Sequence, residues 1–155
     1  MYETEKWLVY EHGDFLEDLE TIVGLIKKLD APRQIPLFAS GRFDGIYGIP
    51  AGGLVPAVYL HHRVELPLLL APTNRTIVFD DIVDSGSSIS HYIKKGNFTI
   101  SLFFKVECQF KPNIWLREKS TKWVLFPWEN NEEYEGAVLP KGRRGIVCPT
   151  GEMNS

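Results

Sequence analysis

Residues 76–90, TIVFDDIVDSGSSIS, constrain the fold more than any other stretch of the sequence. An apolar, β-branched run predicts a buried strand, and it leads directly into Asp80 and Asp81. Two adjacent carboxylates on a strand point to opposite sides and repel one another, so they need hydroxyl donors or a cation as partners. The stretch therefore predicts a strand whose carboxyl end carries a polar site.

The Gly/Ser patch that follows Asp84 has the composition of an anion-binding loop. It offers a turn glycine, three hydroxyl groups and the N–H groups at the start of a helix expected over 87–95. Together these groups form a cradle for a phosphate monoester. The lysine of a Walker loop is missing, which argues against an ordinary nucleoside-triphosphate site. A simpler interpretation is that Asp84 or a serine only caps the helix.

Apolar runs and helical periodicity alternate along the chain. Helices are expected over 14–30, with Asp14 as the N-cap, and over 54–62. Strands are expected over 43–49, 65–71, 76–81, 98–106 and 122–127. This order, with continuous apolar runs, predicts an α/β fold with a mostly parallel, twisted sheet and helices on both faces. In such sheets ligands bind at the carboxyl ends of the strands.

The length of 155 residues, 44% of them hydrophobic, suits one well-buried core. We expect a single domain over residues 1–129. The remaining segment, 130–155, lacks sustained periodicity and mixes an acidic cluster with a basic one. We expect this tail to be an edge hairpin or partly disordered.

Charge and cysteine content narrow the partners and the compartment. A net charge of −3 provides no basic field, so no nucleic-acid partner is expected. Cys108 and Cys148 are far apart and form no metal-ligand pattern, so both are expected to be free thiols. The acidic start MYETEKW is unlike a signal peptide, and the apolar run LPLLLAP is too short to span a bilayer. We expect a cytoplasmic protein with no membrane association.

Three motifs resemble one known family. VFDDIVDSGSS, residues 78–88, closely resembles the phosphoribosyl pyrophosphate (PRPP) signature of the type I phosphoribosyltransferases. GIYGIPAGGLVPAVYL, residues 45–60, is similar to the pyrophosphate loop and following helix of the purine salvage members, especially the xanthine/guanine and hypoxanthine enzymes. KWVLFPWE, residues 122–129, resembles their purine-pocket strand. The motifs occur in the family's order and cover roughly residues 44–129.

The resemblance implies a reaction and its participants. Ribose 5-phosphate would pass from PRPP to a purine nitrogen, with release of pyrophosphate, through an oxocarbenium-like transition state with Mg²⁺ bound. The partners would be PRPP and a purine base. Many relatives are dimers, so a homodimer is one option for the assembly.

The resemblance also assigns roles to single residues. Asp84 matches the candidate general base, and Asp80 and Asp81 would hold the ribose hydroxyls directly or through Mg²⁺. The 5′-phosphate would be bound by Asp84, Ser85, Gly86, Ser87 and Ser88, the pyrophosphate by Ala51, Gly52 and Gly53, the purine by Lys105, Trp123 and Val124, and the metal by Asp80, Asp81 and Glu129.

In the purine pocket, Lys105 would donate to the 6-oxo group, which favours a 6-oxopurine over adenine. Trp123 would stack on the base, and the backbone of Val124 would read the edge near position 2. The alternatives are that Lys105 is a solvated lysine at a strand end and that Trp123 belongs to the core. An orotate or other pyrimidine enzyme is disfavoured but not excluded.

The sequence departs from the family at two points. Ala51 stands where the pyrophosphate loop usually carries Arg or Lys, and the Pro50–Ala51 bond is expected to be cis. Only PTNR, residues 72–75, replaces the long mobile lid that relatives insert before the signature strand. We therefore expect a shortened or missing lid, with the tail as a substitute cover. The alternative function is a nonenzymatic PRPP- or nucleotide-binding regulatory module on the same fold.

Overall fold

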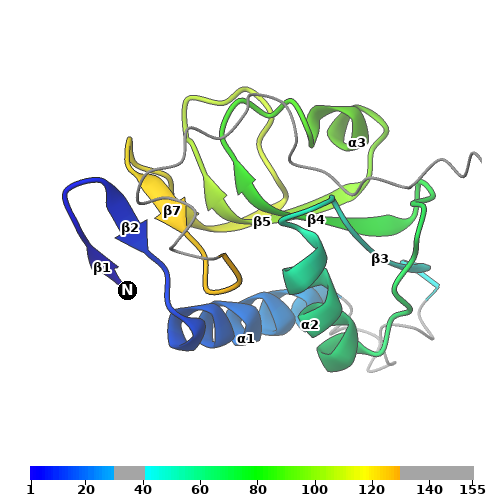
Figure 1. Ribbon diagram of the computed structural model, residues 1–155. Helices are drawn as coiled ribbons and strands as arrows, with labels where there is room; N and C mark the ends of the chain where they lie inside the picture. Colours follow the sequence, from blue (N-terminus) through cyan, green and yellow to red (C-terminus); the bar gives the residue numbers. More distant parts are fainter. Residues whose placement is uncertain (30–40, 130–155) are drawn as a thin grey trace, which may run out of the picture.

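The computed structural model describes residues 1–29 and 41–129 (Figure 1). Its elements are β1 (Tyr2–Glu3), β2 (Trp7–Val9), α1 (His12–Leu29), β3 (Gly45–Gly48), α2 (Leu54–Val64), β4 (Thr76–Val83), α3 (Ser90–Lys94), β5 (Phe98–Phe104), β6 (Ile114–Glu118) and β7 (Trp123–Leu125). The tail over 130–155, with its predicted hairpin or disorder and its proposed role as a cover, lies outside the described residues.

The larger of two sheets has four strands in the order β3-β4-β5-β6, and every neighbouring pair runs parallel. Parallel strands of this kind need cover on both faces. α1 and α2 lie on one side of this sheet and α3 lies on the other (Figure 1). The predicted α/β fold with a parallel sheet is confirmed.

Strand β4 shows why its apolar run has no alternation. Ile77 and Phe79 are buried in the core cluster that includes residues of α1 and α2. Val78 and Val83 are buried in a second cluster with Ile89, which directly precedes α3. Since both faces of the strand are covered, every position up to Phe79 can be apolar.

The amphipathic helix α1 begins two residues earlier than the sequence suggests. Its apolar side is fully covered, with Phe15, Leu19 and Ile22 at 0% exposure. The Asp14 carboxylate accepts the backbone N–H of Glu11 at 3.0 Å. Asp14 therefore lies in the first turn and reaches back to the residue that precedes the helix. The prediction of Asp14 as the N-cap is wrong.

A second sheet has three strands, β1, β2 and β7. The sequence analysis predicted β7 but missed the short strands β1 and β2. β2 runs parallel to β7, with Leu8 opposite Val124, and β1 pairs antiparallel with β2. Strand β6 was also missed, and it forms the edge of the larger sheet beside β5. A partly buried ion pair joins β6 to α1, because Arg117 of β6 donates to Asp18 of α1 at 2.5 and 3.0 Å.

The segment 65–71 is not the predicted strand. It makes one isolated bridge, Ile46 opposite Leu68, and Leu70 is 97% exposed. Pro67 contributes only its carbonyl to this bridge, because proline has no N–H to extend the ladder. The chain then reaches β4 through a short turn in which Asn97 Nδ2 donates to the Thr73 carbonyl at 2.7 Å. No lid is inserted in this connection, as predicted.

Candidate functional site

β4 extends past the end of β3, and this offset places its acidic end beside a loop. β3 pairs with β4 only as far as Gly48 opposite Phe79, whereas β5 stays paired as far as Phe104 opposite Val83. Asp80 and Asp81 therefore have β5 on one side and the chain after β3 on the other. They lie toward the carboxyl edge of the sheet, where a ligand is expected.

The chain after β3 forms the loop from Pro50 to Gly53. Its Pro50–Ala51 peptide bond is cis, as predicted. The Gly53 N–H donates to the Ile49 carbonyl at 2.9 Å, so this predicted pyrophosphate donor already has a partner. In the described part of the chain, the N–H groups of Ala51 and Gly52 make no backbone hydrogen bond. These two donors are available to an anion.

Gly52 passes so close to Asp81 that no side chain fits between them. A β-carbon on Gly52 would lie 2.6 Å from Oδ1 of Asp81 and closer still to Oδ2 and Cγ. Only glycine allows such a close approach. The loop backbone and the acidic strand end thus form one wall of the site, so a ligand on this loop would also meet Asp81.

The two aspartates carry negative charge that their surroundings compensate poorly. Asp80 is 5% exposed, and burial raises the pKa of its carboxyl, although a hydrogen bond from Ser88 Oγ at 2.9 Å opposes that rise. Burial also raises the pKa of Asp81 well above its usual range, and repulsion from Asp80 adds to the rise. Such a pair favours a bound cation or a retained proton.

Glu129, the third predicted metal ligand, lies near this pair. Its charge contributes to the raised pKa of Asp81, while its Oε2 accepts the backbone N–H of Phe126 at 3.1 Å. Within residues 1–29 and 41–129, no three His, Cys, Asp or Glu side chains converge as a metal cage. A cation here would take one or two carboxylates and complete its shell from a substrate and water.

The predicted 5′-phosphate residues form one tight loop after β4. Gly86 turns the chain with φ of +79°, a conformation that favours glycine. The Ser85 hydroxyl donates to Ser87 Oγ at 3.2 Å and accepts the Ser87 N–H at 3.3 Å. The Ser88 hydroxyl is turned toward Asp80. The loop is thus a tight turn whose serine hydroxyls have partners within the protein.

The helix after this loop begins later than predicted, at Ser90 instead of Ser87, and it is five residues long. Its N-cap is Ile89, with no side-chain cap hydrogen bond. The interpretation of Asp84 or a preceding serine as a helix cap is therefore wrong, because the chain uses Asp84–Ile89 for the turn. Any phosphate cradle here consists of loop N–H and hydroxyl groups.

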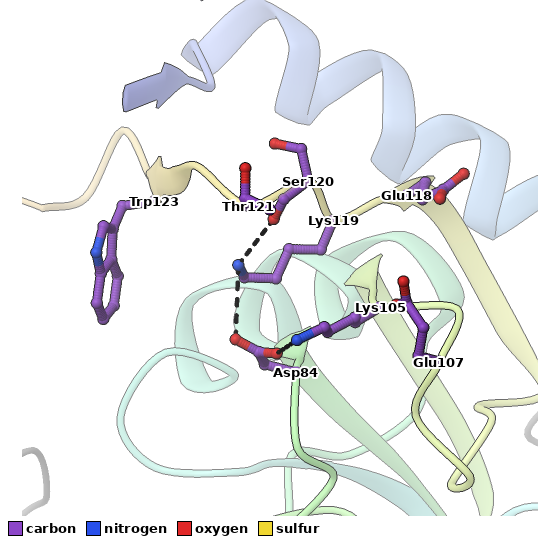
Figure 2. Close-up of a pocket in the computed structure, with 8 residues that line it drawn as sticks. All are labelled: Asp84, Lys105, Glu107, Glu118, Lys119, Ser120, Thr121 and Trp123. Carbon is purple, nitrogen blue, oxygen red and sulfur yellow. Dashed lines mark hydrogen bonds and ion pairs between the residues drawn. The ribbon is translucent and has the colours of Figure 1, made fainter. Parts of the chain in front are cut away.

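Asp84 instead forms ion pairs with two lysines from neighbouring strands (Figure 2). Its Oδ1 lies 3.3 Å from Lys105 Nζ, and its Oδ2 lies 3.5 Å from Lys119 Nζ. Each of these three residues directly follows the last residue of its strand, β4, β5 or β6. Parallel pairing brings these strand ends to one edge of the sheet, so the charges meet there.

This charged group lines a cavity of about 580 Å³. Figure 2 shows Trp123 across the cavity from Asp84 and Lys119. Trp123 is 59% exposed, so the alternative that it belongs to the core is wrong, whereas the Val124 side chain is 7% exposed and packs in the core. The lining consists of Asp84, Lys105, Glu107, Glu118, Lys119, Ser120, Thr121 and Trp123. The indole and the charged strand ends therefore line the same cavity.

Sequence reasoning missed Lys119, because no strand was assigned to residues 114–118. The signal that locates it is the short run IWLRE, which forms strand β6 next to β5. Once β6 is placed there, Lys119 must fall beside Lys105. Its backbone N–H donates to the Phe104 carbonyl at 2.9 Å, which fixes this register.

Two further expectations concern the whole chain. Cys108 is a free thiol, as predicted, and Cys148 lies outside the described residues. Among the helices of residues 1–29 and 41–129, none combines the length and the apolar character that crossing a bilayer requires.

Comparison with solved structures identifies the fold. A purine phosphoribosyltransferase from Pyrococcus horikoshii superposes with a TM-score of 0.64 at 18% identity, covering 80% of this chain and 94% of that one. The chain has the type I phosphoribosyltransferase fold. A xanthine-guanine-hypoxanthine phosphoribosyltransferase from Helicobacter pylori matches with a TM-score of 0.63 at 21% identity, over 83% of this chain and 97% of that one.

A third similar structure is that of a hypothetical protein from Neisseria gonorrhoeae with bound ppGpp. It matches with a TM-score of 0.59 at 14% identity, over 86% of this chain and 95% of that one. No protein-family model matches the sequence. The likeness establishes a shared fold, so the chemistry must be argued from the side chains of the site.

Proposed function

We propose that this chain transfers ribose 5-phosphate from PRPP to a 6-oxopurine, forming a nucleoside monophosphate and pyrophosphate. The observation that carries the proposal is the pairing of Asp84 Oδ1 with Lys105 Nζ, 3.3 Å apart at two adjacent strand ends. In a purine, the substituent on C6 and N7 lie side by side on one edge. A donor next to an acceptor complements this edge when C6 carries an oxygen and N7 carries a proton.

The same pair disfavours adenine. Its 6-amino group is a donor and would face the ammonium of Lys105, leaving two donors opposed. Trp123 would stack on any purine and therefore adds affinity without selecting the base. Selection at C6 then depends on Lys105, and the exposed fraction of its side chain, 46%, leaves it room to adjust to the ring.

PRPP would occupy the other side of Asp84. We assign the pyrophosphate to the loop Ala51–Gly53, where two N–H groups are available, and the 5′-phosphate to the loop Ser85–Ser88. The ribose would then lie between them, beside Asp80 and Asp81. Because Asp80 is buried, Asp81 is partly buried and the two are adjacent, they would stabilise positive charge on the ribose ring.

A magnesium ion fits this donor set. The raised pKa values of Asp80 and Asp81 favour a bound cation in place of a proton, and Mg²⁺ prefers one or two carboxylates together with substrate oxygens and water. When bound, the ion would neutralise charge on the departing pyrophosphate. Glu129 would add negative charge near the ion, with one of its carboxylate oxygens bonded to the Phe126 N–H.

In the proposed reaction, the bond between ribose C1 and the pyrophosphate oxygen breaks, and a bond between C1 and purine N9 forms. The electron pair of the broken bond leaves with pyrophosphate. The proton on N7 passes to Asp84, whose carboxylate faces the cavity between two lysines (Figure 2).

The proposal includes a cytoplasmic location and, as one option, a homodimer.

The test is incubation with PRPP, Mg²⁺ and each nucleobase in turn, with pyrophosphate release as the readout. Release with hypoxanthine, guanine or xanthine and none with adenine or orotate supports the proposal. Lys105→Met should raise the KM for the base more than it lowers kcat, because Lys105 acts through binding. Product with adenine at an equal rate would overturn the assignment of Lys105.

A regulatory module is the second candidate function, and two observations favour it. The connection between residues 71 and 76 holds no lid to exclude water from the site, and one structure with this fold was solved with ppGpp bound. A chain that binds PRPP or a guanine nucleotide at micromolar concentration but releases no pyrophosphate with any base would support this function instead.

A further inference from the structure

Lys119 is the most buried cation of the cavity. Its side chain is 10% exposed, against 46% for Lys105. Its ammonium group contacts three oxygens, Asp84 Oδ2 at 3.5 Å and the carbonyls of Ser120 and Lys122 at 3.0 and 3.5 Å. Two of these contacts are hydrogen bonds to carbonyl oxygens, and the contact with Asp84 is an ion pair. Lys119 is thus held in place, and turning it elsewhere would leave a buried cation with fewer partners.

Lys105 differs in every one of these respects. It is half-exposed, and the described structure gives its ammonium group one ion pair, with Asp84 Oδ1. It can therefore turn from Asp84 to the 6-oxo group of a base at little cost. When it does so, Asp84 loses one of its two cations, and Lys119 remains.

We propose that Lys119 is a positioning residue, which keeps the Asp84 carboxylate aimed at N7 of the base while Lys105 engages the 6-oxo group. The inference rests on the proposed function, because it takes Asp84 as the group that receives the N7 proton. Lys119 itself touches neither the base nor PRPP in this scheme, and its effect passes through Asp84.

A rival route for any effect of Lys119 is the turn before Trp123. The carbonyls of Ser120 and Lys122 belong to that turn, so the loss of Lys119 could displace the indole instead of Asp84. The two routes make different predictions in a variant without the Asp84 charge. An effect that passes through Asp84 disappears there, whereas an effect through Trp123 persists.

The experiment is a double-mutant cycle with Lys119→Met, Asp84→Asn and the double variant. The first readout is steady-state kinetics of pyrophosphate release. The second is the affinity, by calorimetry with PRPP and Mg²⁺ present, for 9-deazahypoxanthine. This base has carbon in place of the reacting nitrogen and a proton on N7, so it probes the Asp84 contact without turnover. Lys119→Arg retains the cation, and Lys122→Met is the control from the same turn.

We expect Lys119→Met to lower kcat about tenfold, with the KM for PRPP unchanged, and to weaken 9-deazahypoxanthine by a similar factor. In the Asp84→Asn background, neither quantity should change further. Lys119→Arg should recover most of the loss. Lys122→Met should match the wild type, because its ammonium group pairs with Glu3 at 2.6 Å and not with the cavity.

An unchanged Lys119→Met enzyme, or a loss that persists in the Asp84→Asn background, overturns the role of Lys119 and leaves the proposed function standing. A wild-type chain that binds 9-deazahypoxanthine but releases no pyrophosphate from PRPP with any base overturns the proposed function, and the affinity cycle alone then decides the role of Lys119. A chain that neither reacts nor binds this base overturns both.

Discussion

The backbone of Gly52 and the carboxylate of Asp81 are in direct contact, with no room for a β-carbon between them. One belongs to the loop after β3 and the other to the acidic end of β4, so the two predicted parts of the PRPP site are a single packed unit. A ligand that moves one part must move the other. This contact offers a direct test of whether the two parts bind one substrate.

Gly52→Ala should disable the site. The added methyl group would overlap the carboxylate of Asp81, which is partly buried and accepts the Ile82 N–H at 2.9 Å, so turning it away would break this hydrogen bond. We expect pyrophosphate release to fall at least about tenfold and the free energy of unfolding to fall by about 1–3 kcal/mol, as for other overpacked sites. Kinetics and urea unfolding measure the two effects.

The matched control is Gly24→Ala in α1, where nothing lies within 4 Å of the added carbon. This change should leave turnover intact and raise the free energy of unfolding by about 0.5–1 kcal/mol, because alanine favours a helix. If Gly52→Ala behaved like Gly24→Ala, the contact with Asp81 would have no importance for binding or stability.

Stability should fall as pH rises when no cation is bound. Because burial raises the pKa values of Asp80 and Asp81, and repulsion from Asp80 raises that of Asp81 further, the folded chain keeps protons that the unfolded chain has lost. Between the unfolded pKa, about 3.9, and the raised folded values, the folded state binds more protons, so the free energy of unfolding decreases with increasing pH. Mg²⁺ should reduce this loss by replacing the proton.

Asp81→Asn isolates this effect from the other titrating groups. The measurement is the free energy of urea unfolding of the wild type and of Asp81→Asn at about pH 5 and about pH 8, with and without Mg²⁺. The variant should be more stable than the wild type at the higher pH without the ion, and insensitive to Mg²⁺. Equal pH dependence in both proteins would show that the acidic pair does not titrate as described.

Asp84→Asn should separate catalysis from binding. It removes the group that receives the N7 proton, and we expect kcat to fall by about 10² or more while PRPP affinity stays near the wild-type value. The Asp84 side chain is half-exposed, so water screens its ion pairs. Their loss should lower the free energy of unfolding by about 1 kcal/mol or less. No helix cap is lost, since Asp84 does not cap α3.

Glu3→Gln is the matched control for Asp84→Asn. Glu3 also pairs with a lysine, and its side chain is 57% exposed, but it lies in β1 and does not line the cavity. It should lose a similar small amount of stability and keep full activity. Unchanged turnover in Asp84→Asn would remove Asp84 from the reaction.

Local patterns were enough to locate the acidic edge of the sheet. The apolar run 76–79 predicts β4 because both of its faces are covered, and the run 43–49 predicts β3, which ends before Pro50. The family resemblance added the cis bond between Pro50 and Ala51, which the structure confirms. These features depend on residues adjacent in sequence, so the sequence reveals them directly.

The features that sequence reasoning missed depend on pairing between distant segments. β2 is three residues long and gains its hydrogen bonds from pairing with β7 and β1, so it has no pattern of its own. Lys119 acquires its place from the register of β6 on β5. Helix length at α3 was overestimated for a related reason, because the turn at Gly86 uses residues that have ordinary helical propensity.

The last prediction concerns Arg117, which joins β6 to α1. Its guanidinium donates to both carboxylate oxygens of Asp18, which is 8% exposed, and the Tyr10 hydroxyl donates to the same carboxylate at 2.6 Å. Arg117→Met leaves this buried charge with the tyrosine as its remaining side-chain donor. We expect the free energy of urea unfolding to fall by about 3 kcal/mol, because a buried charge without its counter-ion is strongly destabilising.

Two comparisons decide whether charge is the cause. Adding Asp18→Leu to Arg117→Met should recover much of the loss, since removing both charges leaves an apolar contact in their place. Lys122→Met, which breaks the more exposed pair with Glu3, should cost about 1 kcal/mol or less. A double variant less stable than Arg117→Met alone would mean that Arg117 acts through its packing on the Tyr10 ring, 5.6 Å from the guanidinium carbon, and not through Asp18.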